Sequence, residues 1–348
     1  MNRLELKQVL KKATRAVKDG FHSGANSLLL QVKSGTLTIS ARNTIWAIRA
    51  WADIAYGEKE LSCVVDAALF TKVVDKMTGE DIKLSISKGC LIIRSGKTKA
   101  SIPYRDDKNW SNPPSFKPLH RLDISEEALK CSHALAKSEA RNGLLSSYHV
   151  EAFENGYCVT ATDTKRISVC CFGSGKLKYD FAIDGEFLKE AVTLSGGKAF
   201  LETDTENVLV VGNDVELYAK TRPEHYPNIQ SILANRKSST TITVNRKDFL
   251  EALMVTTLMD NIIVIDVSEK NVIMSNKPSI KGDSHTELDA MIQGSSNLRI
   301  GLDGSYIRDA IQALEEEEIT LHFGHAKAPV YLEESFQTEL IMPVIIRD

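Results

Sequence analysis

The sequence has little that would place the protein in a membrane, a secretory pathway or a metal-binding class. Its apolar runs all fall short of the roughly 18 residues that a membrane-spanning helix needs. The first residues, Met1 to Lys7, lack the apolar core of a signal peptide. The six cysteines show no zinc-ligand spacing, and several stand in apolar strand-like runs, where a cysteine is typically a small buried hydrophobe. These absences indicate a cytoplasmic protein without metal, cofactor or membrane contact.

Neither sign of charge dominates the composition. The 43 lysines and arginines stand against 46 aspartates and glutamates, for a net charge of −3. This balance argues against a protein that holds DNA tightly through many phosphate contacts. It still permits a protein that carries its positive charge on a single face. With 43% hydrophobic residues the chain is too apolar to be disordered, and its 348 residues allow two or three globular domains.

Catalytic and phosphate-binding patterns are missing or incomplete. The eight histidines form no partnered Cys–His or Ser–His constellation. Gly173 to Lys176 resembles a phosphate-binding loop, but it lacks the full glycine spacing and the hydroxyl residue after the lysine, which favours a turn. His322 and His325 stand on a predicted strand, where residues three apart point to opposite faces and make a poor metal pair. We therefore expect a protein that is not an enzyme, with catalysis as the first alternative.

What the sequence does contain is an internal repeat. Asp66, Asp184 and Asp303 each follow a β-prone run, and they lie 118 and 119 residues apart. Large apolar residues follow at the third and fourth positions and mostly smaller ones at the seventh and eighth, which makes one apolar stripe on a helix. An aspartate at this place caps the helix, because its carboxylate accepts hydrogen bonds from first-turn amides. Since the interval is about one third of the chain, we predict three similar domains in tandem.

Other segments recur at nearly the same interval. Each third opens with a short strand-like stretch and an amphipathic helix, predicted over Leu4–Val17, Leu122–Ala136 and Ile242–Val255. In the first two thirds, alternating strand pairs follow around turn residues. The predicted fold class is α+β, with two helices packed on antiparallel sheet in each of three domains, residues 1–118, 119–239 and 240–348. A tandem duplication without a shared task is the alternative.

Four motifs along the chain are typical of one family. Ala161 to Ile167 resembles the segment A-T-D-G-H-R-L, and Leu340 to Val344 resembles a closing apolar-apolar-Met-Pro motif. Tyr226 to Asn228 resembles F-P-D/N, and Asn26 to Leu37 resembles N-L-L-L-Q-V…G-T-L. Their order covers all three thirds of the chain. By these motifs the sequence resembles the beta sliding clamp, the processivity factor of bacterial DNA polymerase III.

The resemblance implies a fold and a function. In that family two subunits close head to tail into a ring of six similar domains, with helices lining the hole and sheets forming the outer wall. A heterologous arrangement that closes on itself makes such a ring. The resemblance thus implies a homodimer that encircles double-stranded DNA without sequence specificity and gives processivity. Its partners would be the DNA polymerase III catalytic subunit, the clamp loader and repair proteins, which bind through short linear motifs.

Helices that line a hole for DNA should carry basic residues on their exposed faces. The first helix has four basic residues spaced by four, four and three positions, which places them on one stripe: Lys7, Lys11, Arg15 and Lys18. The other predicted helices add Lys72, Lys76, Lys130, Lys137, Arg141, Lys189 and Arg308. Such residues would contact phosphates, which position DNA but carry no sequence information. For any one of them, an ordinary solvated helix face is the alternative.

The family's second site is a cleft for short linear peptides between the middle and last domains. Carried over residue by residue, the resemblance implies a cleft formed by Thr162, Thr164, Lys165, Arg166, Ile167, Pro227, Ile232, Tyr306, Leu340, Ile341, Met342, Pro343 and Val344. Apolar side chains would make a hollow for hydrophobic anchors, while Arg166 and nearby backbone groups fix orientation. Methionine suits a surface that must repack for many partners. The alternative for Ile341 and Met342 is a place in the core of a final strand.

The sequence departs from the family pattern at some of these positions. Thr164 and Lys165 stand where the family usually has Gly and His, which makes the rim of the cleft bulkier and more basic. Ala100 stands where a large apolar side chain often supports the ring interface, with Ile102 nearby. These departures fit a divergent clamp. They leave two further alternatives, a protein-binding scaffold of clamp fold without DNA retention and a clamp dedicated to a mobile element.

Overall fold

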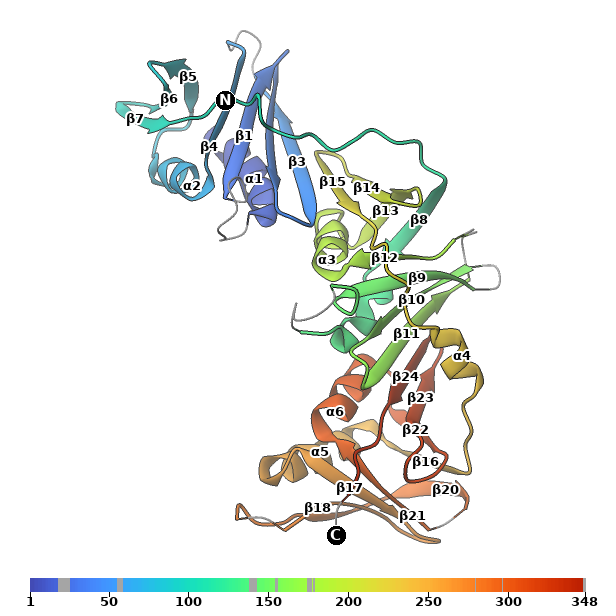
Figure 1. Cartoon of the computed structure of the whole chain (residues 1–348). Helices are drawn as coiled ribbons and strands as arrows, with labels where there is room; N and C mark the ends of the chain where they lie inside the picture. The colour runs from blue at the N-terminus through green and yellow to red at the C-terminus, as the bar shows by residue number, and fades with distance from the viewer. Residues whose placement is uncertain are drawn as a thin grey trace. The chain divides into compact units, whose positions relative to one another are not determined.

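The structure of the chain is a computed structural model, shown in Figure 1. Two predicted DNA-facing residues, Lys18 and Arg141, lie outside the part that it describes, as do Ser174 to Lys176 of the loop that resembles a phosphate site. The described residues are 1–17, 26–54, 59–137, 143–153, 156–173, 177, 179–278, 280–295 and 297–346.

The chain forms two compact units. The first comprises residues 1–126 and 186–222, and the second comprises residues 127–185 and 223–348. Each unit contains antiparallel sheets with helices packed on them, so the predicted α+β class is confirmed. The division into three domains at residues 118 and 239 stays a prediction. No helix in the described ranges has the length and apolar character to cross a membrane.

The first unit is built on an eight-stranded sheet with the order β4-β1-β2-β3-β15-β14-β13-β8. The strands are β1 (Ser27–Lys33), β2 (Thr36–Arg42), β3 (Trp46–Asp53), β4 (Leu61–Asp66), β8 (His120–Ser125), β13 (Lys198–Thr203), β14 (Asn207–Val211) and β15 (Val215–Lys220). A smaller sheet contains β5 (Lys83–Ser87), β6 (Cys90–Ser95) and β7 (Thr98–Pro103). The helical segments are α1 (Arg3–Ala13), η1 (Thr14–Ala16), α2 (Ala67–Lys76) and α3 (Gly185–Leu194), whose first residue belongs to the second unit.

The second unit is built on a nine-stranded sheet with the order β12-β9-β10-β11-β24-β23-β22-β16-β20. The strands are β9 (Ser147–Phe153), β10 (Gly156–Thr162), β11 (Arg166–Phe172), β12 (Phe181–Asp184), β16 (Thr240–Asn245), β20 (Ala290–Gly294), β22 (Glu318–Phe323), β23 (Val330–Glu334) and β24 (Gln337–Ile341). A second sheet contains β17 (Ile262–Val267), β18 (Val272–Asn276), β19 (His285–Leu288) and β21 (Leu298–Asp303). The helical segments are η2 (Glu127–Ala134), α4 (Ile229–Ala234), α5 (Arg246–Met259) and α6 (Gly304–Ala313).

The strand order repeats three times along the chain. The groups β4-β1-β2-β3, β12-β9-β10-β11 and β21-β17-β18-β19 share one topology, in which a later strand pairs with the first of three consecutive strands. The first group is extended by β15, with Ala47 opposite Tyr218, and the second is extended by β24, with Ile167 opposite Leu340. In the described part of the chain β19, the last strand of the third group, pairs with β18 alone. The sequence repeat therefore corresponds to a repeat of sheet topology.

Helices follow the three repeated aspartates, as the repeat predicts. α2, α3 and α6 begin directly after Asp66, Asp184 and Asp303. The Asp66 carboxylate accepts a hydrogen bond of 2.7 Å from the amide of Leu69, and the Asp303 carboxylate accepts one of 2.9 Å from the amide of Ser305. Each bond satisfies an amide that the first helical turn leaves without a partner. The predicted N-caps at Asp66 and Asp303 are confirmed.

The turns before β3 and β11 are each stabilised by a polar side chain that accepts hydrogen bonds from the backbone. The side-chain oxygen of Asn43 accepts hydrogen bonds from the amides two and three residues later, at 2.8 and 2.9 Å. Asp163 accepts from the amides at the same two offsets, at 2.9 and 3.2 Å. Both are Asx turns, in which a short polar side chain replaces a backbone acceptor. Trp46 and Arg166 therefore occupy equivalent positions at the start of two equivalent strands.

The helix predicted within Leu122–Ala136 differs in type from the prediction. The strand β8 takes up its beginning, and the rest is η2, a 3₁₀ helix. Side chains of η2 compete for its own carbonyl groups, because Cys131 Sγ donates to the carbonyl of Ala128 at 3.4 Å and His133 Nδ1 lies 3.0 Å from the carbonyl of Lys130. Local bonds of this kind tighten a helical segment at the expense of regular α-helical pairing.

The two histidines considered as a metal pair do not share a strand. His322 lies in β22 and stacks on Tyr331 with ring centroids 4.7 Å apart. His325 comes after the last residue of β22, Phe323, so its predicted place on the strand is wrong. Among the residues that the structure describes, no group of three or more His, Cys, Asp or Glu side chains is arranged to hold a metal ion.

Candidate functional site

Arg166 is almost fully buried at the beginning of β11, with 3% of its side chain exposed. Its Nε donates to Asp163 Oδ2 at 3.1 Å, and its Nη1 donates to Asp309 Oδ2 at 2.7 Å. The guanidinium carbon lies 4.4 Å from the ring centroid of Tyr306. A planar cation with carboxylates on its edge and an aromatic ring on its face is held in one orientation. Arg166 thereby links β11 to α6, which carries both Tyr306 and Asp309.

The turn before Arg166 is constrained by its side chains. Thr162 is buried, and its hydroxyl donates to the carbonyl of Arg166 at 2.6 Å and accepts from the amide of Thr164 at 3.2 Å. Thr164 has a φ of +76°, in the left-handed region. A β-branched residue seldom adopts this conformation, whereas glycine adopts it without steric cost. Thr164 and Lys165 are both exposed, so the turn presents its side chains at the surface.

Replacing Thr164 by glycine is expected to stabilise the protein by roughly 0.5–1 kcal/mol. The left-handed conformation costs an L-residue about 1–2 kcal/mol, and the greater freedom of glycine in the unfolded chain offsets about half of that gain. Urea denaturation followed by circular dichroism measures the difference. Thr78 is exposed and has no left-handed φ, so Thr78→Gly should destabilise the protein. If both variants were less stable than the wild type, strain at Thr164 would be excluded.

The C-terminal segment runs beside this turn. Leu340 lies opposite Ile167 and Ile341 lies opposite Arg166 in the β11–β24 ladder. Beyond the strand, the amide of Met342 donates to the carbonyl of Lys165 at 2.8 Å. Ile341 is fully buried in the main core of the second unit, whereas 41% of Met342 is exposed. The alternative that these two residues belong to the core of a final strand therefore holds for Ile341. It is wrong for Met342, whose exposed side chain is available to a partner.

A cavity of about 380 Å³ adjoins Met342. Its size lies within the range of pockets that bind small ligands or side chains. It is lined by Arg299, Gly301, Ala326, Lys327, Met342, Pro343, Val344, Ile345 and Ile346. The amide of Val344 donates to the carbonyl of Gly301 at 2.8 Å, which fixes the segment against β21. The cavity lining thus combines apolar residues of the C-terminal segment with the cationic side chains of Arg299 and Lys327.

Helix α4 packs on the same strands, through a cluster that includes Ile167 and Leu340. Asn228 caps this helix, accepting from the amide of Ser231 at 2.9 Å, and Pro227 stands exposed before it. Ile229 is 1% exposed and belongs to a small apolar cluster with Cys158, Ile167, Val169 and Leu340. Ile232, one turn later, is 42% exposed. The structure therefore brings Ile167 and Leu340 together beneath α4, with Ile232 at the surface of that helix.

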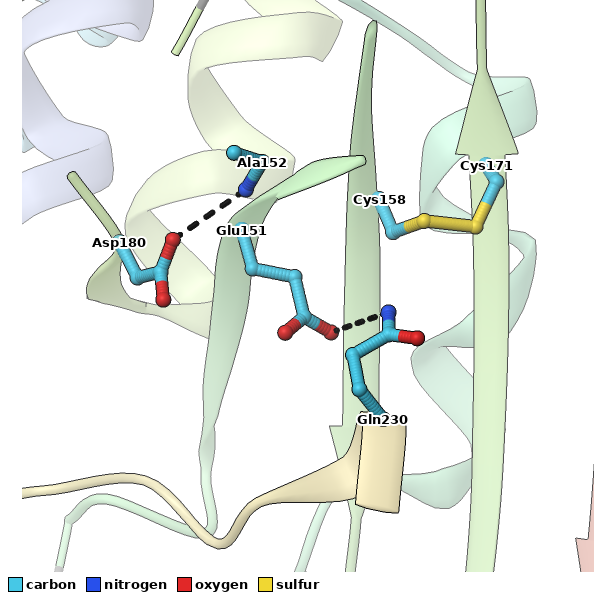
Figure 2. The surroundings of a disulfide bond; sticks show 6 residues. All are labelled: Glu151, Ala152, Cys158, Cys171, Asp180 and Gln230. Carbon is cyan, nitrogen blue, oxygen red and sulfur yellow. Dashed lines mark hydrogen bonds between the residues drawn. A yellow bond between two sulfur atoms is a disulfide. The ribbon is translucent and has the colours of Figure 1, made fainter. Parts of the chain in front are cut away.

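The small apolar cluster contains a disulfide bond, shown in Figure 2. Cys158 on β10 and Cys171 on β11 lie directly opposite each other, with their Cα atoms 4.0 Å apart, and they are bonded. The other cysteines are free, and Cys63, Cys131 and Cys170 are buried. The interpretation of the cysteines as small buried hydrophobes therefore holds for these three and is wrong for the bonded pair.

A buried polar network lies on the other face of the β11–β24 ladder. Glu339 is 1% exposed and accepts hydrogen bonds from Ser168 and from Gln337, the latter at 2.7 Å. His133 Nε2 lies 3.0 Å from the same carboxylate. Burial acts to lower the pKa of His133, but the hydrogen bond and charge of Glu339 outweigh burial, so the pKa is raised. The network ties η2 to both strands beneath the candidate cleft.

Several of the predicted DNA-facing residues are paired with acidic side chains. Lys7 lies 3.0 Å from Asp75, and Arg15 lies 2.5 Å from Glu190. In the second unit, Lys130 pairs with Glu315 at 2.5 Å, and Arg308 lies 3.9 Å from Asp309. Such pairs reduce the positive charge that these residues offer to phosphates. The spacing of basic residues in the sequence did not reveal their acidic partners.

The remaining predicted DNA-facing residues keep their charge free. They have no acidic partner within the described ranges, and all are exposed: Lys11, Lys72, Lys76, Lys137 and Lys189. Four of them stand in helices of the first unit, namely α1, α2 and α3. Free, exposed lysines on helices are suited to weak contacts with a polyanion.

The structure also adds residues that the sequence motifs missed. Asp309 holds Arg166, Ile229 anchors α4, and Ile345 and Ile346 line the cavity. Asp309 stands three residues after Tyr306 in α6, so helical spacing could have placed the two on one face. The others had no sequence signal, because their contacts join segments far apart in the chain.

Comparisons with known proteins bear on this site. Residues 232–345 match the family model of the DNA polymerase III beta subunit, C-terminal domain. The chain is 26% identical over 321 residues to the beta sliding clamp of Bacillus subtilis, covering 83% of each protein. The chain thus resembles the beta sliding clamps along most of its length. The identity to the clamp of Staphylococcus aureus is 22%, over 97% of this chain and 94% of that one.

Solved structures of beta clamps share the fold. The sliding clamp of Bacillus subtilis matches with a TM-score of 0.89 at 20% identity, covering 100% of this chain and 98% of that chain. The DNA polymerase III beta subunit of Thermotoga maritima matches with a TM-score of 0.88, also at 20% identity, over 100% and 99%. Both comparisons confirm the fold of a beta clamp and the resemblance found in the motifs. The roles of the individual cleft and helix residues stay predictions.

Proposed function

We propose that this beta clamp relative acts as a sliding clamp, a homodimeric ring that encircles duplex DNA and tethers replication and repair proteins. It would work without catalysis, by keeping its partners on DNA. The observation that carries the proposal is the repeated sheet junction. The last strand of one repeated group pairs with a strand from the following third of the chain twice, as β3 with β15 and β11 with β24.

We infer that the same junction is made a third time between two copies of the chain. The strand of the third group that corresponds to β3 and β11 is β19, and in the described part of the chain its outer edge is unpaired. The strand that corresponds to β15 and β24 is β7, whose outer edge is also unpaired there. The unpaired N–H and C=O groups of such an edge can form backbone hydrogen bonds with a strand of another chain. Joining β19 of one copy to β7 of another is a heterologous contact, and two such contacts close a ring.

Charge and apolar surface support this pairing. Two lysines at β7, Lys97 and Lys99, are exposed and have no acidic partner among the described residues. Three acidic residues at β19, Asp283, Glu287 and Asp289, are exposed and have no basic partner there. Opposite charges on two edges favour the mixed contact over the contact of like edges. Helix α5, which packs on β19, exposes three apolar residues that another protein surface could cover: Met254, Val255 and Leu258. Ile102 on β7 is buried in its own core and Ala100 is half-buried, so α5 would supply most of the apolar area.

The proposed DNA contacts are the free lysines of the helices. Lysine contacts to phosphate are independent of sequence and weaken with salt, which suits a protein that must move along DNA. Ion-paired residues such as Lys7 and Arg15 would contribute less. The net charge of −3 agrees with a ring that holds DNA by its topology more than by affinity.

The proposed partner cleft comprises the Arg166 turn, α4 and the C-terminal segment. Its apolar floor is formed by Ile167 and Leu340, and Met342 is exposed at its edge. The braced Arg166 and the exposed Lys165 would orient a peptide backbone or an acidic side chain. Partners of this kind are the DNA polymerase III catalytic subunit, the clamp loader and repair proteins, through short linear motifs.

Retention on circular DNA tests the proposal. The dimer is loaded on a nicked circular plasmid by the clamp loader of the same cell, and the DNA-bound fraction is separated by gel filtration. We expect retention on the circle and release when one restriction cut makes it linear. Protein that leaves circular and linear DNA equally fast would contradict a ring. If such a protein still bound partner peptides, it would be the scaffold without DNA retention.

Reversing Lys11, Lys72 and Lys76 to glutamate is expected to shorten retention on the circle at moderate salt. Removing one lysine–phosphate interaction should reduce the slope of log affinity against log salt by about 1. A control with the same change of net charge reverses three exposed residues of strands and turns, Lys33, Lys220 and Lys270. Equal retention by the two triple variants would refute the helix lysines as the residues that hold DNA.

A further inference from the structure

The bonded cysteine pair lies in the floor of the candidate cleft. In β11 side chains alternate between the two faces of the sheet, so Cys171 shares a face with Val169 and Ile167. Cys158 is a fully buried member of the same apolar cluster as Ile167 and Leu340, and Cys171 packs against that cluster. One layer of side chains therefore separates the disulfide bond from the surface on which a partner's apolar anchor would rest.

The same pair is connected to α4. Ile229, the buried anchor of this helix, belongs to the cluster that contains Cys158. On the other side, Cys158 lies opposite Glu151 in the β9–β10 ladder, and Gln230 Nε2 of α4 donates to Glu151 Oε1 at 3.2 Å (Figure 2). Burial raises the pKa of Glu151 above its ordinary value. Two neighbouring residues of α4 are thus seated on Cys158 and on its cross-strand neighbour.

Reduction of the bond changes the space that the cluster needs. Bonded sulfurs lie about 2.05 Å apart, whereas non-bonded atoms settle about 3.5–4.0 Å apart. The cluster is closely packed, with Cys158 and Ile229 at 0% and 1% exposure, so the added distance has to be taken up by neighbouring side chains. Ile229 is the buried cluster member that belongs to α4, so a shift of its side chain would move this helix and its exposed Ile232.

We propose that Cys158 and Cys171 form a redox couple that sets the affinity of the partner cleft, an inference that rests on the proposed function of that cleft. In the oxidised protein the bond fixes β10 against β11, and the cleft is pre-organised for a peptide. A dithiol reductant transfers two electrons and two protons to the bond, yielding two thiols, while the reductant itself becomes a disulfide. The reduced cleft has to reorder α4 when a partner binds, and it binds more weakly.

The other cysteines do not compete for this chemistry. Burial, with a smaller contribution from Asp107, raises the pKa of Cys63 to about 12, and burial is also the main cause of the raised pKa of Cys131. Such thiols form little thiolate, which is the species that exchanges with disulfides. Cys170 points to the other face of the sheet from its neighbour Cys171. Cys90, half-buried on β6, lies in the other unit and serves as a control position.

The test combines peptide binding with a count of thiols on the same sample. The full-length protein is oxidised with glutathione disulfide or reduced with dithiothreitol, which is then removed. Fluorescence polarisation measures the affinity for a labelled peptide that carries the clamp-binding motif of a DNA polymerase III catalytic subunit. Alkylation followed by mass spectrometry counts thiols, with four expected in the oxidised protein and six in the reduced one. Cys171→Ser is compared with Cys90→Ser.

We expect reduction to weaken peptide binding by about threefold to tenfold, and oxidation to restore it. Cys171→Ser should bind like the reduced protein in both conditions, while Cys90→Ser should respond like the wild type. Equal affinity of samples with four and six thiols overturns the redox inference and leaves the cleft standing. Six thiols after oxidation also overturn it. Peptide that fails to bind either form overturns the proposed cleft, and the redox inference with it.

Discussion

Replacing Leu258 by aspartate is expected to convert the proposed dimer into monomers at micromolar concentration. Leu258 is 72% exposed near the end of α5, a helix that packs against β19. If a second copy covers this surface, the substitution removes apolar packing and also places an unpaired charge in the interface. Together these effects should weaken association by more than about a hundredfold. Gel filtration with light scattering measures the mass directly.

A second exposed leucine serves as the control for this substitution. Leu119 is 60% exposed and directly precedes β8, away from α5 and from β7 in the chain. Leu119→Asp should remain a dimer. The monomeric Leu258→Asp protein should also fail to stay on circular DNA, because an open chain of domains cannot encircle it. A dimeric Leu258→Asp protein would place the interface elsewhere.

Replacing Arg166 by alanine is expected to destabilise the protein by about 2–3 kcal/mol and to abolish measurable peptide binding. The substitution removes two charge-assisted hydrogen bonds and the stacking on Tyr306. It leaves Asp163 without its cation and Asp309 with Arg308 alone, at 3.9 Å. Asp163 and Asp309 are 14% and 24% exposed, so water would relieve part of the cost. Urea denaturation and fluorescence polarisation report the two effects separately.

Two further variants isolate the cause. Arg166→Lys keeps the charge but removes the planar fork and the stacking, so it should fall between the wild type and Arg166→Ala. Arg121 pairs with Glu202 at 2.9 Å with 64% of its side chain exposed, so Arg121→Ala should cost less than about 1 kcal/mol. Equal stability of Arg121→Ala and Arg166→Ala would contradict the bracing role of Arg166.

The repeated features of the fold could be predicted because their cause is local. A helix N-cap such as Asp66 needs only the carboxylate and the amides that follow it in sequence, and the apolar stripe needs only helical spacing. The three-residue interval of Tyr306 and Asp309 carried similar information. By contrast, Glu190 and Glu315, which neutralise Arg15 and Lys130, stand 175 and 185 residues away from them. Basic spacing could not show such distant partners.

The disulfide joins residues of neighbouring strands, and the sequence contained part of the information needed to predict it. Cys158 and Cys171 are equally distant from the turn at Thr164 and Lys165, so a hairpin centred there places them opposite each other. The interpretation of the cysteines as buried hydrophobes passed over this register. At Thr164 the comparison with the family pattern predicted a bulkier rim of the cleft. It did not predict the left-handed backbone conformation that the turn imposes on this residue. Strand register and backbone conformation depend on how the strands pair, and the amino-acid composition carries no information about this pairing.

The proposed cleft is tested by the affinity of the full-length protein for the labelled clamp-binding peptide, with and without the double substitution Met342→Ala and Pro343→Ala. Met342 is 41% exposed and borders the cavity, and its removal leaves the buried Leu340 and Ile341 in place. The control is Met291→Ala, an exposed methionine on β20. We expect saturable binding to the wild type and to Met291→Ala, and binding at least about tenfold weaker to the double variant. Equal affinity for all three proteins, or no binding to the folded protein, would contradict the proposed cleft.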